Sequence, residues 1–192
     1  MNEKQIKIIL TGLGGQGVLT AGILIAQTAI EEKLYTTWFP SYGAEMRGGI
    51  SSSTVIISND EIGSPIVLNP DILISLNESS LSKFAQKINN NTIVVTNSTI
   101  TSNIKIKNKK IYHIPMTDTA NKTIKNLRTI NMIAVGFLIK LINSSFRNYE
   151  NKNIETIIHL ENALKACEKI FKSKKKLIEV NKKAIYVGYN FV

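Results

Sequence analysis

A glycine-rich loop at residues 11–17 constrains the fold more than any other stretch of this chain. It reads Thr-Gly-Leu-Gly-Gly-Gln-Gly and lies between a short β-branched apolar run at 6–10 and a long apolar run at 18–30. The first run is typical of a buried strand and the second of a helix. This glycine loop therefore joins a strand to the N-terminus of a helix, as in the first unit of many α/β domains.

The glycine loop also predicts a binding site. Gly12, Gly14 and Gly17 have the spacing of a dinucleotide-type phosphate loop, in which glycines form the turn, admit a ligand to the backbone and pack helix against strand. The predicted contacts are the N–H groups of Gly14, Gly15, Gln16 and Gly17 and the side-chain amide of Gln16. They lie where a helix N-terminus attracts anions. The alternative is a tight turn that binds nothing.

Two common ligands of such loops are not favoured here. An NAD site usually has an acidic residue about 20 positions after the glycines, at the end of the second strand. The predicted second strand, 35–40, contains no acid. An ATP-type loop needs a lysine and a hydroxyl residue after its last glycine, but Gly17 is followed by Val18 and Leu19. A different phosphate-bearing ligand is expected.

A second loop, at residues 40–49, is unlike its apolar neighbours. It contains a proline, three glycines, an acid and an arginine. Arg47, followed by Gly48, can make a bidentate contact to a phosphate or carboxylate. The alternative for Arg47 is an internal salt bridge to Glu45. We include Arg47 and Gly48 in the predicted binding site.

The rest of the chain alternates strands with helices. Strands are predicted at 6–11, 35–40, 52–58, 71–76, 92–96 and 111–114, with a minor strand at 104–107; helices are predicted at 17–32, 81–88, 130–142, 153–171 and 175–187. Residues 77–80 supply capping groups, and Gly188 suits the end of the last helix. We expect a single α/β domain over 1–192, with a Rossmann-like, mostly parallel sheet flanked by helices and a helical C-terminal third.

The charge of the chain is concentrated in its second half. The net charge is +10, and residues 97–192 contain eighteen Lys or Arg against six Asp or Glu. The lysines occur in polar runs without interleaved aromatic or arginine residues, so we expect no nucleic-acid partner. A solvated face, an acidic partner or an anionic ligand explains them. The apolar run at 18–30 is shorter than the roughly 20 residues that span a bilayer, which predicts a cytoplasmic protein without membrane contact.

Catalytic and metal-binding groups are scarce. The single cysteine, Cys167, cannot by itself hold zinc or an iron–sulfur cluster, which need about four ligands. His113 falls in a predicted strand and His159 within the predicted helix 153–171, and both are interpreted as structural or exposed. No nucleophile–base spacing and no acidic cluster for magnesium stand out. We therefore predict no catalytic residue and no metal site in this chain.

Several short motifs follow one another along the chain: GLGGQG at 12–17, SYGAEMRGG at 41–49, IGSP at 62–65, PD at 70–71, IP at 114–115, NMI at 131–133, Ala184 and Gly188. Together they resemble one enzyme family, the γ subunit or γ domain of 2-oxoacid:ferredoxin (acceptor) oxidoreductases. The resemblance covers essentially the whole chain. The form of the second loop at 44–49 is more similar to the 2-oxoglutarate-type than to the pyruvate-type enzymes.

The resemblance implies a non-catalytic subunit of a heteromeric enzyme. Such enzymes decarboxylate a 2-oxoacid oxidatively with coenzyme A, form an acyl-CoA and reduce ferredoxin. Thiamine diphosphate, Mg and iron–sulfur clusters would lie on thiamine-binding α/β subunits and a ferredoxin-like subunit. This chain would hold no cofactor alone and would help to enclose coenzyme A; isolated, it could form a homodimer.

Two further functions stay open. One is the small subunit of an indolepyruvate-type oxidoreductase, which shares the glycine loop and an Arg-Gly-Gly run. The other is a stand-alone module that binds a nucleotide or coenzyme.

Overall fold

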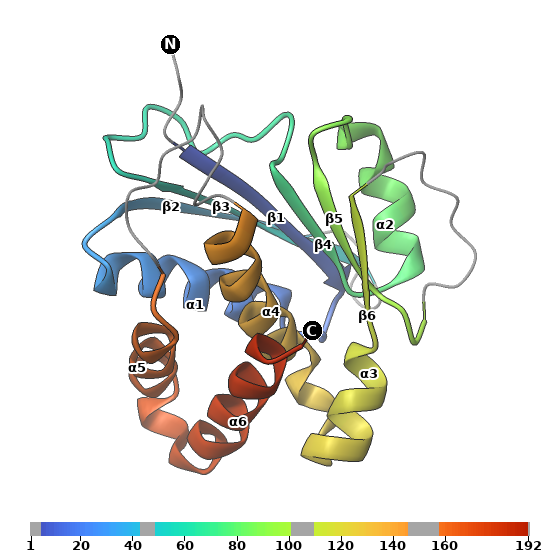
Figure 1. Ribbon diagram of the computed structural model, residues 1–192, viewed down its shortest axis with the longest axis vertical. Coiled ribbons are helices and arrows are strands. Elements are labelled where there is room, and N and C mark those ends of the chain that lie inside the picture. Colours follow the sequence, from blue (N-terminus) through green and yellow to red (C-terminus); the bar gives the residue numbers. More distant parts are fainter. Residues whose placement is uncertain (1–4, 43–48, 101–109, 146–157, 192) are drawn as a thin grey trace.

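The structure is a computed structural model, and it describes residues 5–42, 49–100, 110–145 and 158–191. A six-stranded sheet is covered by helices on both faces, and the last third of the described chain is helical (Figure 1). The predicted α/β class and helical C-terminal third are thus confirmed. The strands are β1 (Gln5–Leu13), β2 (Tyr35–Ser41), β3 (Ile50–Ser58), β4 (Ile72–Ser75), β5 (Ile93–Asn97) and β6 (Ile111–Ile114). The main helices are α1 (Val18–Glu31), α2 (Glu78–Phe84), α3 (Met116–Thr119), α4 (Ile130–Ser145), α5 (Leu160–Ile170) and α6 (Ile178–Tyr189).

The sheet has the strand order β2-β3-β1-β4-β5-β6. The β1–β4, β4–β5 and β5–β6 pairs are parallel. Strand β3 is antiparallel to both β1 and β2, so β2 runs in the same direction as β1. Five strands therefore share one direction and β3 alone opposes them, which confirms the mostly parallel sheet. The apolar pattern of β3 did not reveal its direction.

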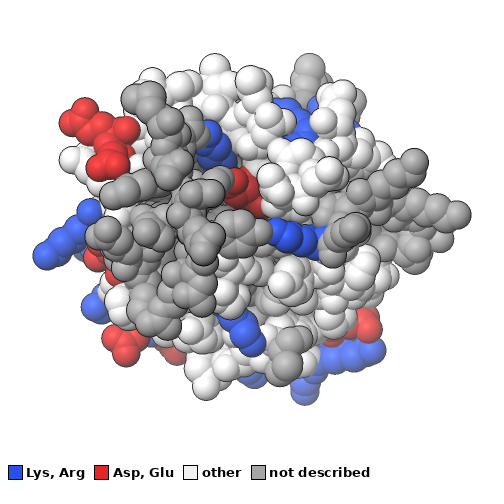
Figure 2. Space-filling view, turned by 45° about the horizontal axis from the view of Figure 1, so that its top comes forward, with Lys and Arg blue, Asp and Glu red and all other residues white. Residues whose placement is uncertain are grey.

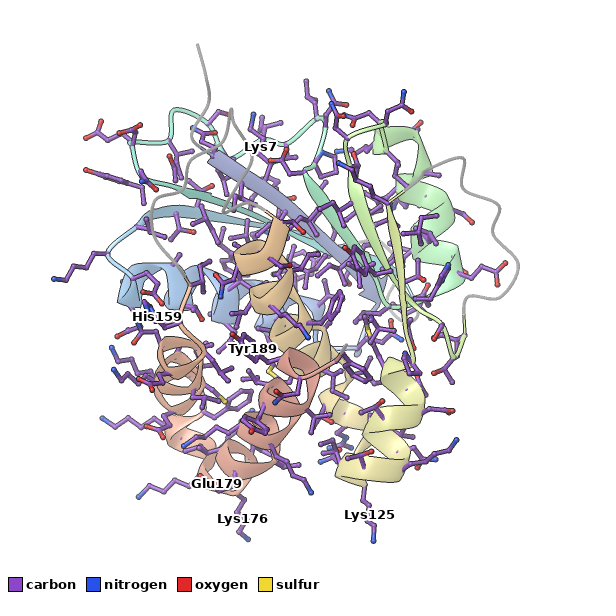
Figure 3. All side chains as sticks on the ribbon, viewed as in Figure 1. Lys7, Lys125, His159, Lys176, Glu179 and Tyr189 are labelled. Carbon is purple, nitrogen blue, oxygen red and sulfur yellow. The ribbon has the colours of Figure 1, made fainter. Side chains whose placement is uncertain are left out.

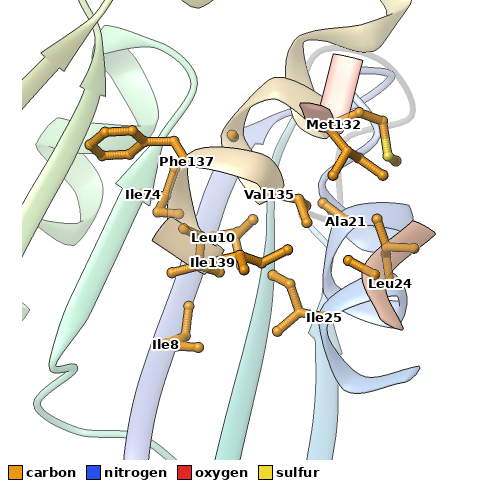
Figure 4. Close-up of a cluster of buried hydrophobic side chains, with 14 of the residues drawn as sticks. Ile8, Leu10, Ala21, Leu24, Ile25, Ile74, Met132, Val135, Phe137 and Ile139 are labelled. Atoms are coloured by element: carbon orange, nitrogen blue, oxygen red, sulfur yellow. The ribbon is translucent and has the colours of Figure 1, made fainter. Parts of the chain in front are cut away.

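Strand β1 is central and buries side chains on both faces. Ile8 and Leu10 contact the larger core, which α1 and α4 cover, while Ile9 belongs to the smaller core beneath α2. In Figure 4, Val135 and Ile139 of α4 meet the sheet residues next to the α1 side chains. Helices α5 and α6 pack outside α1 and α4, respectively. Two layers of helix thus cover one face of the sheet and one layer covers the other.

Helices α4 and α6 approach each other at two glycines. A Cβ atom at Gly188 would overlap the carbonyl oxygen of Ile133, and one at Gly136 would overlap that of Ile185. Gly188 lies inside α6, whose C-cap is Asn190. The last helix ends near Gly188, as predicted, but Gly188 does not form its C-cap. This glycine instead allows α6 to approach α4 closely.

Two predicted helix starts also differ from the structure. Within the described part of 153–171, the helix begins at Leu160, and His159 is its extended N-cap residue instead of a helical one. The Asn143 side chain binds both N and O of Ile158, and His159 N donates to Glu32 Oε1 at 2.6 Å, which holds these residues outside the helix. The last helix begins at Ile178, after a 3₁₀ segment, η4 (Lys172–Leu177).

The connection from β6 to α4 contains helical turns that the sequence did not predict. After α3 come a π-helical turn, η2 (Ala120–Ile124), and a 3₁₀ turn, η3 (Leu127–Thr129). The Asn126 side chain caps η3 by accepting from Arg128 N at 3.0 Å. The predicted minor strand at 104–107 lies outside the described residues.

One helical run is long and apolar enough to cross a membrane, by length and composition. It spans Leu127–Ser145, and 67% of its apolar window is buried inside the fold. Helix α4 packs against the sheet, α1 and α6. Such burial is typical of the central helix of an α/β domain, so this run is weak evidence for a membrane span.

Candidate functional site

The glycine loop lies at the carboxyl end of β1, beside β4. A hydrogen bond of 3.1 Å from Gln16 N to Leu13 O closes the turn, and α1 begins at Val18. Gly15 and Gly17 have φ values of 91° and 73°, in the left-handed region that glycine adopts most easily. The backbone itself therefore requires these two glycines, and the strand–turn–helix geometry predicted from the sequence is confirmed.

Gly12 and Gly14 have different structural roles. A Cβ atom at Gly12 would lie 2.7 Å from Gln16 Oε1 and 2.9 Å from Val18 Cγ2, so Gly12 lets the helix start pack on the strand. Gly14 has no such steric need, since a Cβ atom there would be 3.5 Å from the nearest atom, Gly49 O. Its N–H donates to Gly49 O at 2.8 Å. A hydrogen bond thus joins the end of the second loop directly to the glycine loop.

The side chain of Gln16 stabilises the loop. Its Oε1 accepts from Leu13 N at 2.7 Å and from Asn77 Nδ2 at 2.8 Å. Asn77 is also the N-cap of α2, where its Oδ1 accepts from Ser80 N, as the sequence predicted. The carbonyl end of the Gln16 amide is therefore engaged within the protein, and its NH₂ group is the end available to a ligand.

A third anchor comes from α4. Asn131 Nδ2 donates to Gly17 O at 2.9 Å across 114 residues of sequence. A Cβ atom at Gly17 would overlap this amide. The sequence offered one signal for this contact, because Asn131 is a polar residue in the apolar first half of α4. Gly49, Asn77 and Asn131 thus hold the loop from three sides, and none of them was among the predicted site residues.

The N-terminus of α1 has no compensating acidic group in its own first turn. Among the described residues, no side chain caps it. A helix N-terminus presents free N–H groups and a partial positive charge. The N–H groups of Gly14 and Gln16 are used internally, whereas those of Gly15 and Gly17 donate to no described residue. The geometry suits an anion at Gly15 to Val18.

The remaining predicted site residues, Arg47 and Gly48, lie outside the described residues, as does Glu45. Their neighbour Gly49 places the end of the second loop against Gly14. The site that combines both loops remains a prediction. It is supported by this contact.

The cysteine and the two histidines each have partners or burial that fit a structural role. Burial raises the pKa of the Cys167 thiol to about 11, so this cysteine is a protonated core residue. His113 lies in β6 with its Nδ1 2.9 Å from Thr96 Oγ1, and His159 pairs with Glu32 at 3.1 Å. No cluster of three metal-ligating side chains occurs in the part of the chain that the structure describes. On the face in Figure 2, acidic and basic side chains are interspersed.

Comparison with known proteins gives the family. The model of the pyruvate ferredoxin/flavodoxin oxidoreductase family matches residues 7–191. The chain is 31% identical over 185 residues to the ketoisovalerate oxidoreductase subunit VorA of Methanothermobacter marburgensis, covering 96% of this chain and 36% of VorA. It is 33% identical over 150 residues to the 2-oxoglutarate synthase subunit KorC of Methanocaldococcus jannaschii, covering 74% of this chain and 80% of KorC.

The fold is also shared with a solved enzyme. The 2-oxoglutarate:ferredoxin oxidoreductase of Magnetococcus marinus superposes with a TM-score of 0.80 at 24% identity, covering 97% of this chain and 30% of that one. The chain thus spans about a third of the length of VorA and of this enzyme chain. From the family match and the KorC similarity, the chain belongs to the pyruvate ferredoxin/flavodoxin oxidoreductase family.

Proposed function

We propose that this chain is the γ subunit of a 2-oxoacid:ferredoxin oxidoreductase and is inactive alone. The complex would decarboxylate a 2-oxoacid oxidatively with coenzyme A and transfer two electrons to ferredoxin. The observation that carries the proposal is the family match over residues 7–191.

The proposed substrate is 2-oxoglutarate. The second-loop motif at 44–49 favours it, and so does KorC, whose length this chain nearly spans. A branched 2-oxoacid is the second candidate, because the ketoisovalerate subunit VorA matches almost the whole chain. Rates of the assembled complex with 2-oxoglutarate, 3-methyl-2-oxobutanoate, pyruvate and indolepyruvate separate these candidates. A clear preference for indolepyruvate would move the chain to the indolepyruvate-type enzymes.

The proposed role of the chain is to help enclose coenzyme A. The uncapped N-terminus of α1 and the contact between Gly14 and Gly49 support a phosphate-binding edge formed by both loops. A coenzyme A-bound structure is known for the Magnetococcus marinus enzyme, which shares this fold. Arg47 and Gly48 would complete the edge. Gly12, Gly14, Gly15, Gln16 and Gly17 would shape it.

The proposed partners are thiamine-binding α/β subunits and a ferredoxin-like subunit, all in the cytoplasm. They would carry thiamine diphosphate, Mg and the iron–sulfur clusters, and residues 1–192 would form one domain against them. A stand-alone coenzyme-binding module is the competing function. Calorimetry of the isolated chain with coenzyme A, FAD and NAD tests it, because tight binding of a dinucleotide without partners would favour the module.

The Arg47→Ala variant tests the coenzyme A role. Loss of a charge-assisted contact to phosphate should raise the KM for coenzyme A by roughly 10-fold or more, with the KM for the 2-oxoacid unchanged. Steady-state kinetics of the assembled complex measure both. Lys125→Ala, which removes one exposed positive charge from the end of η2, is the control and should change neither value. If Arg47→Ala instead dissociates the subunits, the second loop is an interface element.

A further inference from the structure

A cavity of about 350 Å³ lies behind the glycine loop, at the first turn of α1. Elements far apart in sequence enclose it, namely α1, the η3 turn, the start of α4, the end of α5 and the start of α6. Its volume falls within the range of small-ligand sites. Gly17 is the one residue of the glycine loop in its lining, and Gly14 and Gly49, which form the contact between the two loops, are not part of it.

Two buried asparagines in the lining have unused hydrogen-bonding capacity. Asn181 of α6 is 6% exposed, and its side chain makes no hydrogen bond to any described residue. Asn131 is 4% exposed; its Nδ2 binds Gly17 O, while its Oδ1 has no partner among the described residues. Buried amides in native proteins are normally satisfied. Because Asn181 lines the cavity, a ligand there is the natural partner for its amide.

The electrostatics of the cavity favour an anion. Gly17 and Thr20 of the uncapped α1 N-terminus line one side. Arg128 lines another; it is exposed and forms no salt bridge with a described residue. The η4 segment, whose last residue Leu177 also lines the cavity, contains four lysines. An arginine, a helix N-terminus and an amide together offer more donors than one carboxylate can accept, which favours phosphate.

The other walls are apolar. Phe171, Val180 and Met132 line the cavity beside the polar groups. We propose that this cavity binds a phosphate-bearing small organic molecule, with its phosphate between Arg128 and the α1 N-terminus, its body against Phe171 and Val180, and a polar group on Asn181. The cavity shares Gly17 and the α1 N-terminus with the phosphate-binding edge proposed for the two loops, whereas Arg128 and Asn181 belong to the cavity alone.

The test is calorimetric titration of the full chain, in its native assembly, with ADP. Arg128→Ala should weaken ADP binding at least 10-fold, and Asn181→Ala should weaken it several-fold. Lys125→Ala is the matched control, because Lys125 belongs to the same connection and carries the same charge but points away from the fold (Figure 3). It should leave the affinity unchanged. Thermal unfolding of each variant verifies that it is folded, and the exposed position of Arg128 makes that variant the primary one.

Three results would overturn the proposal. The first is unchanged ADP binding in Arg128→Ala, and the second is an equal loss in Arg128→Ala and Lys125→Ala. The third is a loss in Arg47→Ala while Arg128→Ala binds normally, which would assign the nucleotide to the loops. A parallel titration with coenzyme A identifies the source of the phosphate. If Arg128→Ala binds neither ADP nor coenzyme A, the cavity takes the nucleotide end of coenzyme A. If Arg128→Ala loses ADP binding but still binds coenzyme A, the cavity takes a free nucleotide.

Discussion

Gly15 and Gly17 occupy similar backbone conformations in different surroundings. Both have φ in the left-handed region, but a Cβ atom at Gly15 would have no neighbour within 4 Å, whereas one at Gly17 would overlap the Asn131 amide. Backbone strain and steric overlap can therefore be separated within a single loop. The difference predicts how strictly each glycine is required.

Gly17→Ala should lower the free energy of unfolding by about 2–3 kcal/mol, and Gly15→Ala by about 1–2 kcal/mol. Both variants meet the left-handed penalty, and Gly17→Ala also displaces Asn131. Urea unfolding measures the two losses. Replacing Asn131 by Ala in the Gly17→Ala background should remove the overlap and bring the added cost of the glycine substitution down to that of Gly15→Ala. Equal losses in the two single variants would show that Asn131 does not constrain the loop.

Cys167 should be unreactive in the folded protein. Burial raises its pKa to about 11, so at pH 8 the thiolate is scarce, whereas an exposed cysteine has a pKa of about 8.5. Reaction with a disulfide reagent at pH 8 should be at least ~100-fold slower in the native state than in urea. Because the folded pKa lies above the unfolded one, this thiol also lowers the free energy of unfolding as pH rises between them. Rapid labelling of the native protein would contradict a core position.

At the level of elements, the α4–α6 contact depends on glycine. Gly188→Ala should separate the two helices and cost about 1–3 kcal/mol, since the nearest atoms are backbone atoms of Ile133 that cannot rotate away. Gly63→Ala is the control, because no atom lies within 4 Å of a Cβ atom there, and it should stay within about 0.5 kcal/mol of the parent. Urea unfolding compares the two. A small loss in Gly188→Ala would mean that the helices can move apart freely.

The elements that the sequence predicted well are those whose hydrophobic period sets their conformation. Strand β6 has its predicted bounds, and the predicted strands at 6–11 and 35–40 lie within β1 and β2. The predictions are wrong where contacts between residues far apart in sequence determine the conformation. Glu32 and Asn143 hold residues 158–159 extended, and the role of Gly188 depends on a helix more than 40 residues away. No local pattern encodes such contacts.

The candidate site was likewise predicted only where local sequence determines the structure. The glycine spacing predicted the turn and the helix start. It did not predict that Gly49, Asn77 and Asn131 anchor the loop, because these residues come from three other parts of the chain. The cavity lined by Arg128 and Asn181 was also hidden, since η3 and α6 meet only in the folded molecule.

At the scale of the whole molecule, the chain corresponds to one segment of a longer relative. It spans about a third of VorA, so the family contains this fold both as a separate subunit and as a segment of a longer chain. In the proposed function the activity belongs to an assembly of this chain with other subunits.

Isolation of the native assembly tests that claim most directly. The tagged chain is purified from its native source, sized by gel filtration, and its companions are identified by mass spectrometry. We expect thiamine-binding subunits and a ferredoxin-like subunit in stoichiometric amounts, and coenzyme A-dependent reduction of ferredoxin by a 2-oxoacid. A monomer or homodimer without any thiamine-dependent partner would contradict the account.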